Sequence, residues 1–215
     1  MSSSEPIFRI LVADDNPAIH QDFAKVLAPI DPDRQALDQL LLEVLDDPAK
    51  AAQLEVPLPN YELDYASQGR EAYEKALAAE RNGKPFALIF MDVRMPPGWD
   101  GVETIRHIWN DLPHTEIVIC TAFSDYSWEQ ILGELGSSDQ LQFLRKPFDV
   151  VSVKQMSLAL CQKWELAAAN RTHTEHLESE VARRTQDLQH KIAELEKAME
   201  EISKLRGILP MCSYC

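Results

Sequence analysis

Residues 87–92 read Ala-Leu-Ile-Phe-Met-Asp, five apolar residues followed directly by Asp92. Two further, mostly apolar runs also lead into charged residues: 10–12 before Asp14 and Asp15, and 141–144 before Lys146. Short apolar runs bounded by turn residues are typical of buried strands in a parallel sheet. Because ligands bind outside the carboxyl ends of such strands, we expect three carboxylates and one ammonium group to meet at one edge of the sheet.

The three carboxylates predict a metal site. Like charges that are crowded together repel one another unless a cation joins them, and oxygen-only ligands suit Mg²⁺. Taken alone, the Asp14-Asp15 pair has another interpretation, a helix cap, because Pro17 suits the first position of a helix. Asp15 or Asn16 is then the capping residue. Asp92 and Lys146 favour the metal site over the cap alone.

Apolar runs alternate with helical patterns over residues 7–147, which predicts an α/β domain with a parallel sheet. The predicted strands cover 7–13, 61–66, 86–92, 115–121 and 140–145. The predicted helices lie near 17–29, 69–81, 100–110 and 126–135. The segment 31–60 is too long for a simple connection, and its middle, ALDQLLLEVL at 36–45, has an amphipathic pattern. We expect an ordered helical insertion there; the alternative is a mobile acidic loop.

After Pro147 the chain has no glycine or proline until Gly207, which predicts one long helix. From Val181 onward the apolar residues follow a heptad pattern. The d positions are Val181, Leu188, Leu195, Ile202 and Leu209, and the a positions are Thr185, Ile192, Met199 and Arg206. We therefore divide the chain into a domain at 1–165, a coiled-coil helix at 166–209 and a tail at 210–215. The coiled coil predicts a parallel homodimer, and the alternative is a solvated helix that rests on another domain.

Composition limits the classes of function. The chain has 215 residues, a net charge of −14 and a pI of about 4.8, which argues against direct nucleic-acid binding. No apolar run approaches the roughly 20 residues that span a membrane. The four cysteines do not form a disulfide framework, so we expect a cytoplasmic protein. Cys212 and Cys215 are half of a structural zinc site or a bare thiol pair.

Four segments occur in order at predicted strand ends: VADDN at 12–16, IFMDVRMPPGWDG at 89–101, VICTA at 118–122 and FLRKPF at 143–148. With them, residues 7–165 resemble the receiver domain of bacterial two-component response regulators. The likeness is to receivers that read DDNPAIH and MPPGWDG and carry an insertion after the first helix. The resemblance implies a flavodoxin-like, doubly wound sheet of five parallel strands in the order 2-1-3-4-5.

The resemblance also implies a role for each site residue. Asp92 is expected to be the phosphoacceptor, and a sensor histidine kinase is the expected partner. The implied Mg²⁺ ligands are Asp14, Asp15, Asp92 and the backbone carbonyl of Arg94. The implied contacts to the phosphoryl group come from Lys146 and Thr121, and the implied switch residue is Phe143. The chain should only phosphorylate and dephosphorylate itself, and its dimeric coiled coil should pass the change to an output module.

Two positions depart from the usual pattern, and two other functions stay open. The loop between Met95 and Asp100 is one residue longer than usual, and Phe143 stands where many receivers have Tyr. One alternative function is a Mg²⁺-dependent phosphatase with an aspartate nucleophile. Such enzymes usually carry a second Asp two residues after the nucleophile, and that position is Arg94 here. The other alternative is a dimeric scaffold that is not phosphorylated.

Overall fold

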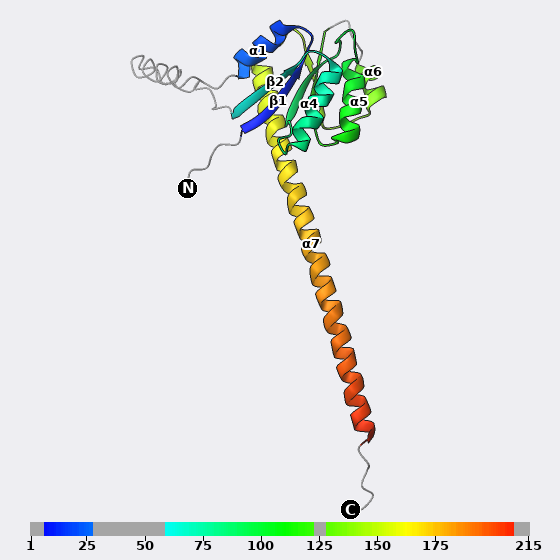
Figure 1. Ribbon diagram of the computed structural model, residues 1–215. Helices are drawn as coiled ribbons and strands as arrows, with labels where there is room; N and C mark the ends of the chain where they lie inside the picture. The colour runs from blue at the N-terminus through cyan, green and yellow to red at the C-terminus, as the bar shows by residue number, and fades with distance from the viewer. Residues whose placement is uncertain (1–6, 28–58, 123–127, 209–215) are drawn as a thin grey trace, which may run out of the picture. The chain divides into compact units, whose positions relative to one another are not determined.

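The computed structural model describes residues 7–27, 59–122 and 128–208 (Figure 1). The predicted insertion, up to residue 58, and the predicted tail at 210–215 lie outside these ranges. The chain divides into two compact units, Met1–Glu165 and Leu166–Cys215. None of the described helices has an apolar stretch long enough to cross a membrane.

Strands and helices alternate through the first unit, as the sequence predicts. The strands are β1 (Ile7–Ala13), β2 (Asn60–Ala66), β3 (Leu88–Asp92), β4 (Glu116–Thr121) and β5 (Leu141–Arg145). The helices are α1 (Pro17–Leu27), α4 (Gly69–Arg81), α5 (Gly101–Asp111), α6 (Trp128–Leu135) and α7 (Val150–Ile208). Within the described residues, the five predicted strands and the helices predicted near 17–29, 69–81, 100–110 and 126–135 occur, with ends that differ by one or two residues.

The five strands form one parallel sheet in the order β2-β1-β3-β4-β5. This is the expected flavodoxin-like order. In register, Ala13 lies opposite Met91, and Asp92 lies opposite Cys120. The residues that follow β1 and those that end β3 therefore meet at the carboxyl edge of the sheet.

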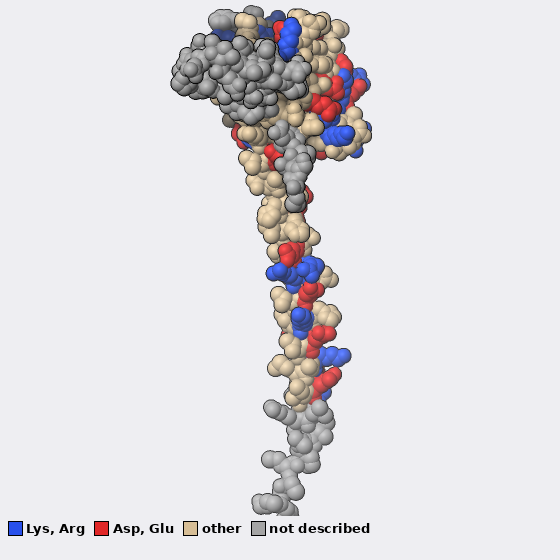
Figure 2. Space-filling view, turned by 90° about the vertical axis from the view of Figure 1, so that its left-hand side faces the viewer, with Lys and Arg blue, Asp and Glu red and all other residues tan. Residues whose placement is uncertain are grey.

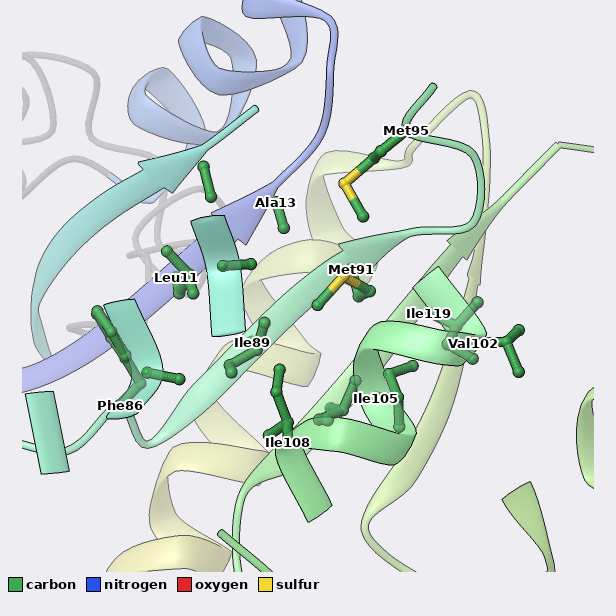
Figure 3. Close-up of a cluster of buried hydrophobic side chains, with 14 of the residues drawn as sticks. Leu11, Ala13, Phe86, Ile89, Met91, Met95, Val102, Ile105, Ile108 and Ile119 are labelled. Carbon is green, nitrogen blue, oxygen red and sulfur yellow. The ribbon is translucent and has the colours of Figure 1, made fainter. Parts of the chain in front are cut away.

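Side chains that alternate along each strand pack against two layers of helices. Leu11 and Ile89 point to a buried cluster with α4, α5 and α6, part of which Figure 3 shows. Ile10 and Phe90 point to the opposite face, where α1 and the first turns of α7 cover them. Both faces of the central strands are thus buried, which explains why these strands read as continuous apolar runs.

Helix α7 changes character along its length. Up to Trp164 it places Val153, Leu160 and Cys161 in the core of the first unit. From Leu166 on, its large apolar side chains are exposed to solvent. Acidic and basic side chains lie interspersed along this second part (Figure 2), and several form pairs one turn apart, for example Glu180 with Arg184 at 2.6 Å.

Candidate functional site

The three predicted aspartates come together at the carboxyl edge of the sheet. Asp14 and Asp15 follow β1, and Asp92 is the last residue of the neighbouring strand β3. One carboxylate oxygen of each lies within 4.8 Å of the other two. Asp14 and Asp92 are buried, at 1% and 8% exposure, whereas Asp15 is exposed. The site therefore has two buried carboxylates and one that faces solvent.

Lys146 connects the two buried aspartates. It follows β5, and its Nζ donates hydrogen bonds to Asp14 Oδ2 at 2.6 Å and to Asp92 Oδ1 at 2.8 Å. Its backbone N–H donates to the carbonyl of Thr121, the last residue of β4, at 2.9 Å. The ends of β4 and β5 thus fix the position from which the ammonium group reaches across the sheet edge.

Burial and charge act in opposite directions on these groups. Burial raises the pKa of Asp92, and the nearby Asp14 adds to this effect, while the hydrogen bond and charge of Lys146 partly offset it. Burial alone would lower the pKa of Lys146, but its hydrogen bonds to Asp14 and Asp92 outweigh this, so the pKa is raised. Lys146 therefore stays protonated and favours the ionised form of Asp92.

The donor set fits a hard divalent cation. The three carboxylates supply oxygen atoms only, two of them from buried side chains, and Mg²⁺ prefers such ligands. Lys146 supplies one positive charge to this cluster of three negative charges, so the cluster retains an excess of negative charge that a cation would neutralise. Arg94, whose carbonyl is the fourth predicted ligand, lies two residues past Asp92 with its side chain exposed.

Thr121 and Phe143 lie on the neighbouring strands. The hydroxyl of Thr121 donates to the carbonyl of Ala122 at 2.9 Å, and its side chain is half-buried. Phe143, within β5, is half-buried and packs against the core cluster on the α4, α5 and α6 side. Thr121, whose carbonyl accepts from the N–H of Lys146, is therefore next to the site. Phe143 lies three residues before Lys146 and belongs to the core cluster.

The start of α1 decides between the two capping residues. Asn16 Oδ1 accepts a hydrogen bond from the N–H of Ala18 at 3.0 Å, so Asn16 caps the helix. Asp14 Oδ1 accepts from the N–H of Asn16 at 2.9 Å. The cap thus leaves Asp15 exposed and uses Asp14 to hold the loop, which reconciles the capping and metal interpretations of this segment.

The loop after Asp92 is held by residues that the sequence did not single out. Gln68, before α4, donates its amide to the carbonyl of Pro96 at 2.9 Å. Trp99, in the same loop, stacks on His107 of α5 with ring centres 4.2 Å apart. A side chain at Gly101 would collide with the backbone oxygen of Asp92, so only glycine fits there. The sequence shows Gly101 directly after Asp100, which is a signal for a position that requires glycine. Nothing in the sequence indicates the contacts of Gln68 and Trp99.

Comparisons with known proteins agree with this geometry. The family described as response regulator receiver domain matches residues 42–157. The chain is 32% identical over 104 residues to the osmosensing histidine protein kinase SLN1 of Saccharomyces cerevisiae, which covers 48% of this chain and 8% of that protein. It is 31% identical over 112 residues to the response regulator ArlR of Staphylococcus epidermidis, which covers 52% of this chain and 46% of that protein. The chain thus spans less than half the length of either relative.

A solved structure shows the same fold. A response regulator receiver domain protein from Clostridium thermocellum superposes with a TM-score of 0.50 at 19% identity, over 74% of this chain and 98% of that one. The family match begins after β1, so Asp14 and Asp15 lie outside it; the parallel pairing of β1 with β3 is what places them beside Asp92. With more than half of its residues matched and the sheet order of the fold in place, the chain belongs to the response regulator receiver domain family.

Proposed function

We propose that this receiver accepts a phosphoryl group on Asp92 from a partner histidine kinase, in a Mg²⁺-dependent reaction. The observation that carries this proposal is the arrangement of three carboxylates around one buried position, with Lys146 bound to two of them at 2.6 and 2.8 Å. A receiver that serves a sensor kinase works in the cytoplasm, and we place this chain there.

The residues around Asp92 each have a part in the transfer. A carboxylate oxygen of Asp92 attacks the phosphorus of a phosphohistidine, an O–P bond forms, the P–N bond breaks, and the imidazole leaves with its electron pair. Lys146 would hold the phosphoryl oxygens once Asp92 carries the phosphoryl group as an acyl phosphate. Asp14, Asp15, Asp92 and the Arg94 carbonyl would hold Mg²⁺, which supplies charge neutralisation for the phosphoryl oxygens when bound.

The hydroxyl of Thr121 gives up a single bond to the Ala122 carbonyl if it turns toward the phosphoryl group. Phe143 pairs with Ile119, two residues before Thr121, so Thr121 and Phe143 lie on the same face of the sheet and Phe143 is the proposed switch residue. A switch residue of this kind moves between an inward and an outward rotamer. Because Phe143 has no hydroxyl, only its packing would distinguish these two rotamers. The reaction modifies the chain itself, so we propose self-phosphotransfer and autodephosphorylation rather than turnover of a free substrate.

We also propose a parallel homodimer through α7. Its heptad residues Leu188, Ile192, Leu195 and Met199 are between 54% and 70% exposed in the single chain. A regular seam of exposed apolar side chains on a long helix is buried most simply by a second copy of the same helix. The dimeric helix would carry the receiver's change to an output module.

Mass measurement tests the central proposal. With acetyl phosphate and Mg²⁺ the chain should gain one phosphoryl group, and beryllofluoride should bind in its place. Asp92→Asn should abolish the gain, while Asp187→Asn, an exposed aspartate on α7, should leave it intact. A normal mass gain in Asp92→Asn would refute the assignment. Arg94 at the position of a phosphatase acid/base predicts no turnover of a free phosphate ester by the same preparation.

A further inference from the structure

The loop between Asp92 and α5 is closed at its base by a backbone hydrogen bond. The N–H of Gly101 donates to the carbonyl of Val93 at 2.9 Å. Residues 94–100 therefore form a loop whose two ends are held together beside Asp92, and we call them the 94–100 loop. Arg94, whose carbonyl is the proposed fourth metal ligand, is the first residue of this loop.

The middle of the 94–100 loop has few means of holding its own shape. Pro96 and Pro97 have no backbone N–H, so neither can donate a hydrogen bond to another part of the chain. Gly98, which follows them, is exposed and has no side chain that could pack. The position of this part of the loop therefore depends on contacts from outside it.

Gln68 supplies such a contact. It is the N-cap residue of α4, but its side chain makes no cap hydrogen bond. Its amide instead donates to the carbonyl of Pro96 at 2.9 Å. The Oε1 atom of the same side chain lies only 3.1 Å from the place that a Cβ on Gly98 would take, so the carboxamide group covers both residues. Because a carbonyl oxygen only accepts, an N–H donor is required at this position.

The start of α4 gives Gln68 a fixed base. A Cβ on Gly69, the next residue, would collide with Thr104 Oγ1 and with the carbonyl oxygen of Trp99. Helix α4 therefore packs directly on α5 and on the far end of the 94–100 loop. A hydrogen bond that starts from this packed helix end restrains the loop rather than moving with it.

We propose that Gln68 is a positioning residue for the metal site. Its hydrogen bond to Pro96 holds the 94–100 loop in the conformation in which the Arg94 carbonyl can join the three aspartates around Mg²⁺. This inference rests on the metal role in the proposed function, and it adds a residue that acts through the loop rather than on the metal itself.

The size of the effect follows from the strength of one hydrogen bond. Without the bond to Pro96, the loop occupies the binding conformation for a smaller fraction of the time, and the apparent metal affinity falls by that fraction. One neutral hydrogen bond corresponds to a change of about two- to tenfold in an equilibrium constant. The loss of the Gln68 donor should therefore weaken metal binding by a factor in this range.

Direct metal binding to the full chain tests the proposal. Mn²⁺ takes the same oxygen ligands as Mg²⁺, and the electron paramagnetic resonance signal of free Mn²⁺ measures its binding, with Mg²⁺ as competitor. Gln68→Met keeps the length of the side chain and removes the donor, so it should raise the dissociation constants of both ions about two- to tenfold. Gln142→Met, at an exposed glutamine of β5, is the matched control and should leave both constants unchanged.

Phosphorylation kinetics separate positioning from a general loss of structure. With acetyl phosphate, the Mg²⁺ concentration that gives half of the maximal rate should rise in Gln68→Met by the same factor as the dissociation constant. The rate at saturating Mg²⁺ should stay near that of the parent chain, because the loop is restored once metal is bound. A rate that falls equally at every Mg²⁺ concentration would overturn the positioning role.

The outcomes also separate Gln68 from the metal site. A parent chain that binds neither ion, or an Asp15→Ala variant that binds them as tightly as the parent, overturns the metal role in the proposed function. A parent chain that binds Mn²⁺ and a Gln68→Met variant that binds it equally tightly leave the metal role standing and overturn the inference on Gln68. A lower free energy of unfolding of metal-free Gln68→Met with unchanged dissociation constants would also overturn it, because the bond to Pro96 would then be purely structural.

Discussion

Replacing Lys163 by Met should destabilise the receiver strongly, because Lys163 neutralises a buried carboxylate. Glu116, the first residue of β4, has a side chain only 3% exposed. Lys163 Nζ lies 3.1 Å from Glu116 Oε2 and 3.1 Å from Asp139 Oδ2, and it donates to the Asp139 carbonyl at 2.6 Å. Lys163 belongs to α7, so these contacts fasten the helix to the starts of the last two strands.

The size of the effect follows from the burial of Glu116. Breaking a fully buried ion pair costs about 3–5 kcal/mol, because one charge is left without a partner. Lys163 is 35% exposed, so water reaches the site and we expect the lower end, about 3 kcal/mol. For a unit of this size that corresponds to a loss of roughly 6–12 °C in Tm. Lys25→Met is the control: Lys25 is 75% exposed and lies 3.6 Å from Asp22, so it should cost less than about 1 kcal/mol.

The loss should depend on pH in a defined direction. Burial raises the pKa of Glu116 above its ordinary value of 4.5, and Lys163 partly offsets this. The pKa of Glu116 is higher in the folded state than in the unfolded state. The free energy of unfolding therefore falls as the pH rises from the unfolded-state pKa to the folded-state pKa, and this contribution no longer changes at higher pH. Without Lys163 the folded pKa rises further, so the deficit of Lys163→Met should be largest above neutral pH and shrink toward pH 5.

Urea unfolding at pH 5 and pH 8 measures this deficit, and a double variant tests its cause. Adding Glu116→Gln to Lys163→Met removes the unpaired charge and should recover most of the lost free energy. The reasoning is refuted if Lys163→Met costs no more than Lys25→Met, or if its deficit is the same at both pH values. It is also refuted if the double variant is no more stable than Lys163→Met.

Three further predictions concern metal, phosphate lifetime and assembly. Mg²⁺ at ten times its dissociation constant should stabilise the chain by about 1.4 kcal/mol, and Asp15→Ala should lose this rise in Tm; an unchanged rise would contradict the metal role. Arg94→Ala should shorten the lifetime of the acyl phosphate, followed by mass over time, if the long, exposed side chain of Arg94, two residues past Asp92, obstructs the approach of water; an equal or longer lifetime counts against shielding. Leu188→Asp with Leu195→Asp should give a monomer by sedimentation with an unchanged receiver melt, because each buried leucine contributes roughly 1.5–3 kcal/mol to the seam; a persistent dimer would exclude this seam.

Local patterns predicted most of the fold. The apolar runs before Asp14 and Asp92 located the central strands, since a strand buried on both faces must be apolar throughout. The absence of glycine and proline between Pro147 and Gly207 predicted α7, because those residues are what most often end a helix. The strand order came from the family resemblance, and the sheet has it.

The sequence by itself determined which residues would gather at the carboxyl edge of the sheet, because chain direction alone brings the ends of parallel strands together. Only the tertiary structure decided how they share it: Lys146 reaches Asp14 across 132 residues of sequence and Asp92 across 54. The same holds for Lys163 and Glu116, which are 47 residues apart. Residue periodicity reports which face of an element is buried, whereas the partner of a buried charge depends on which elements pack side by side, and that information exists only once the chain has folded.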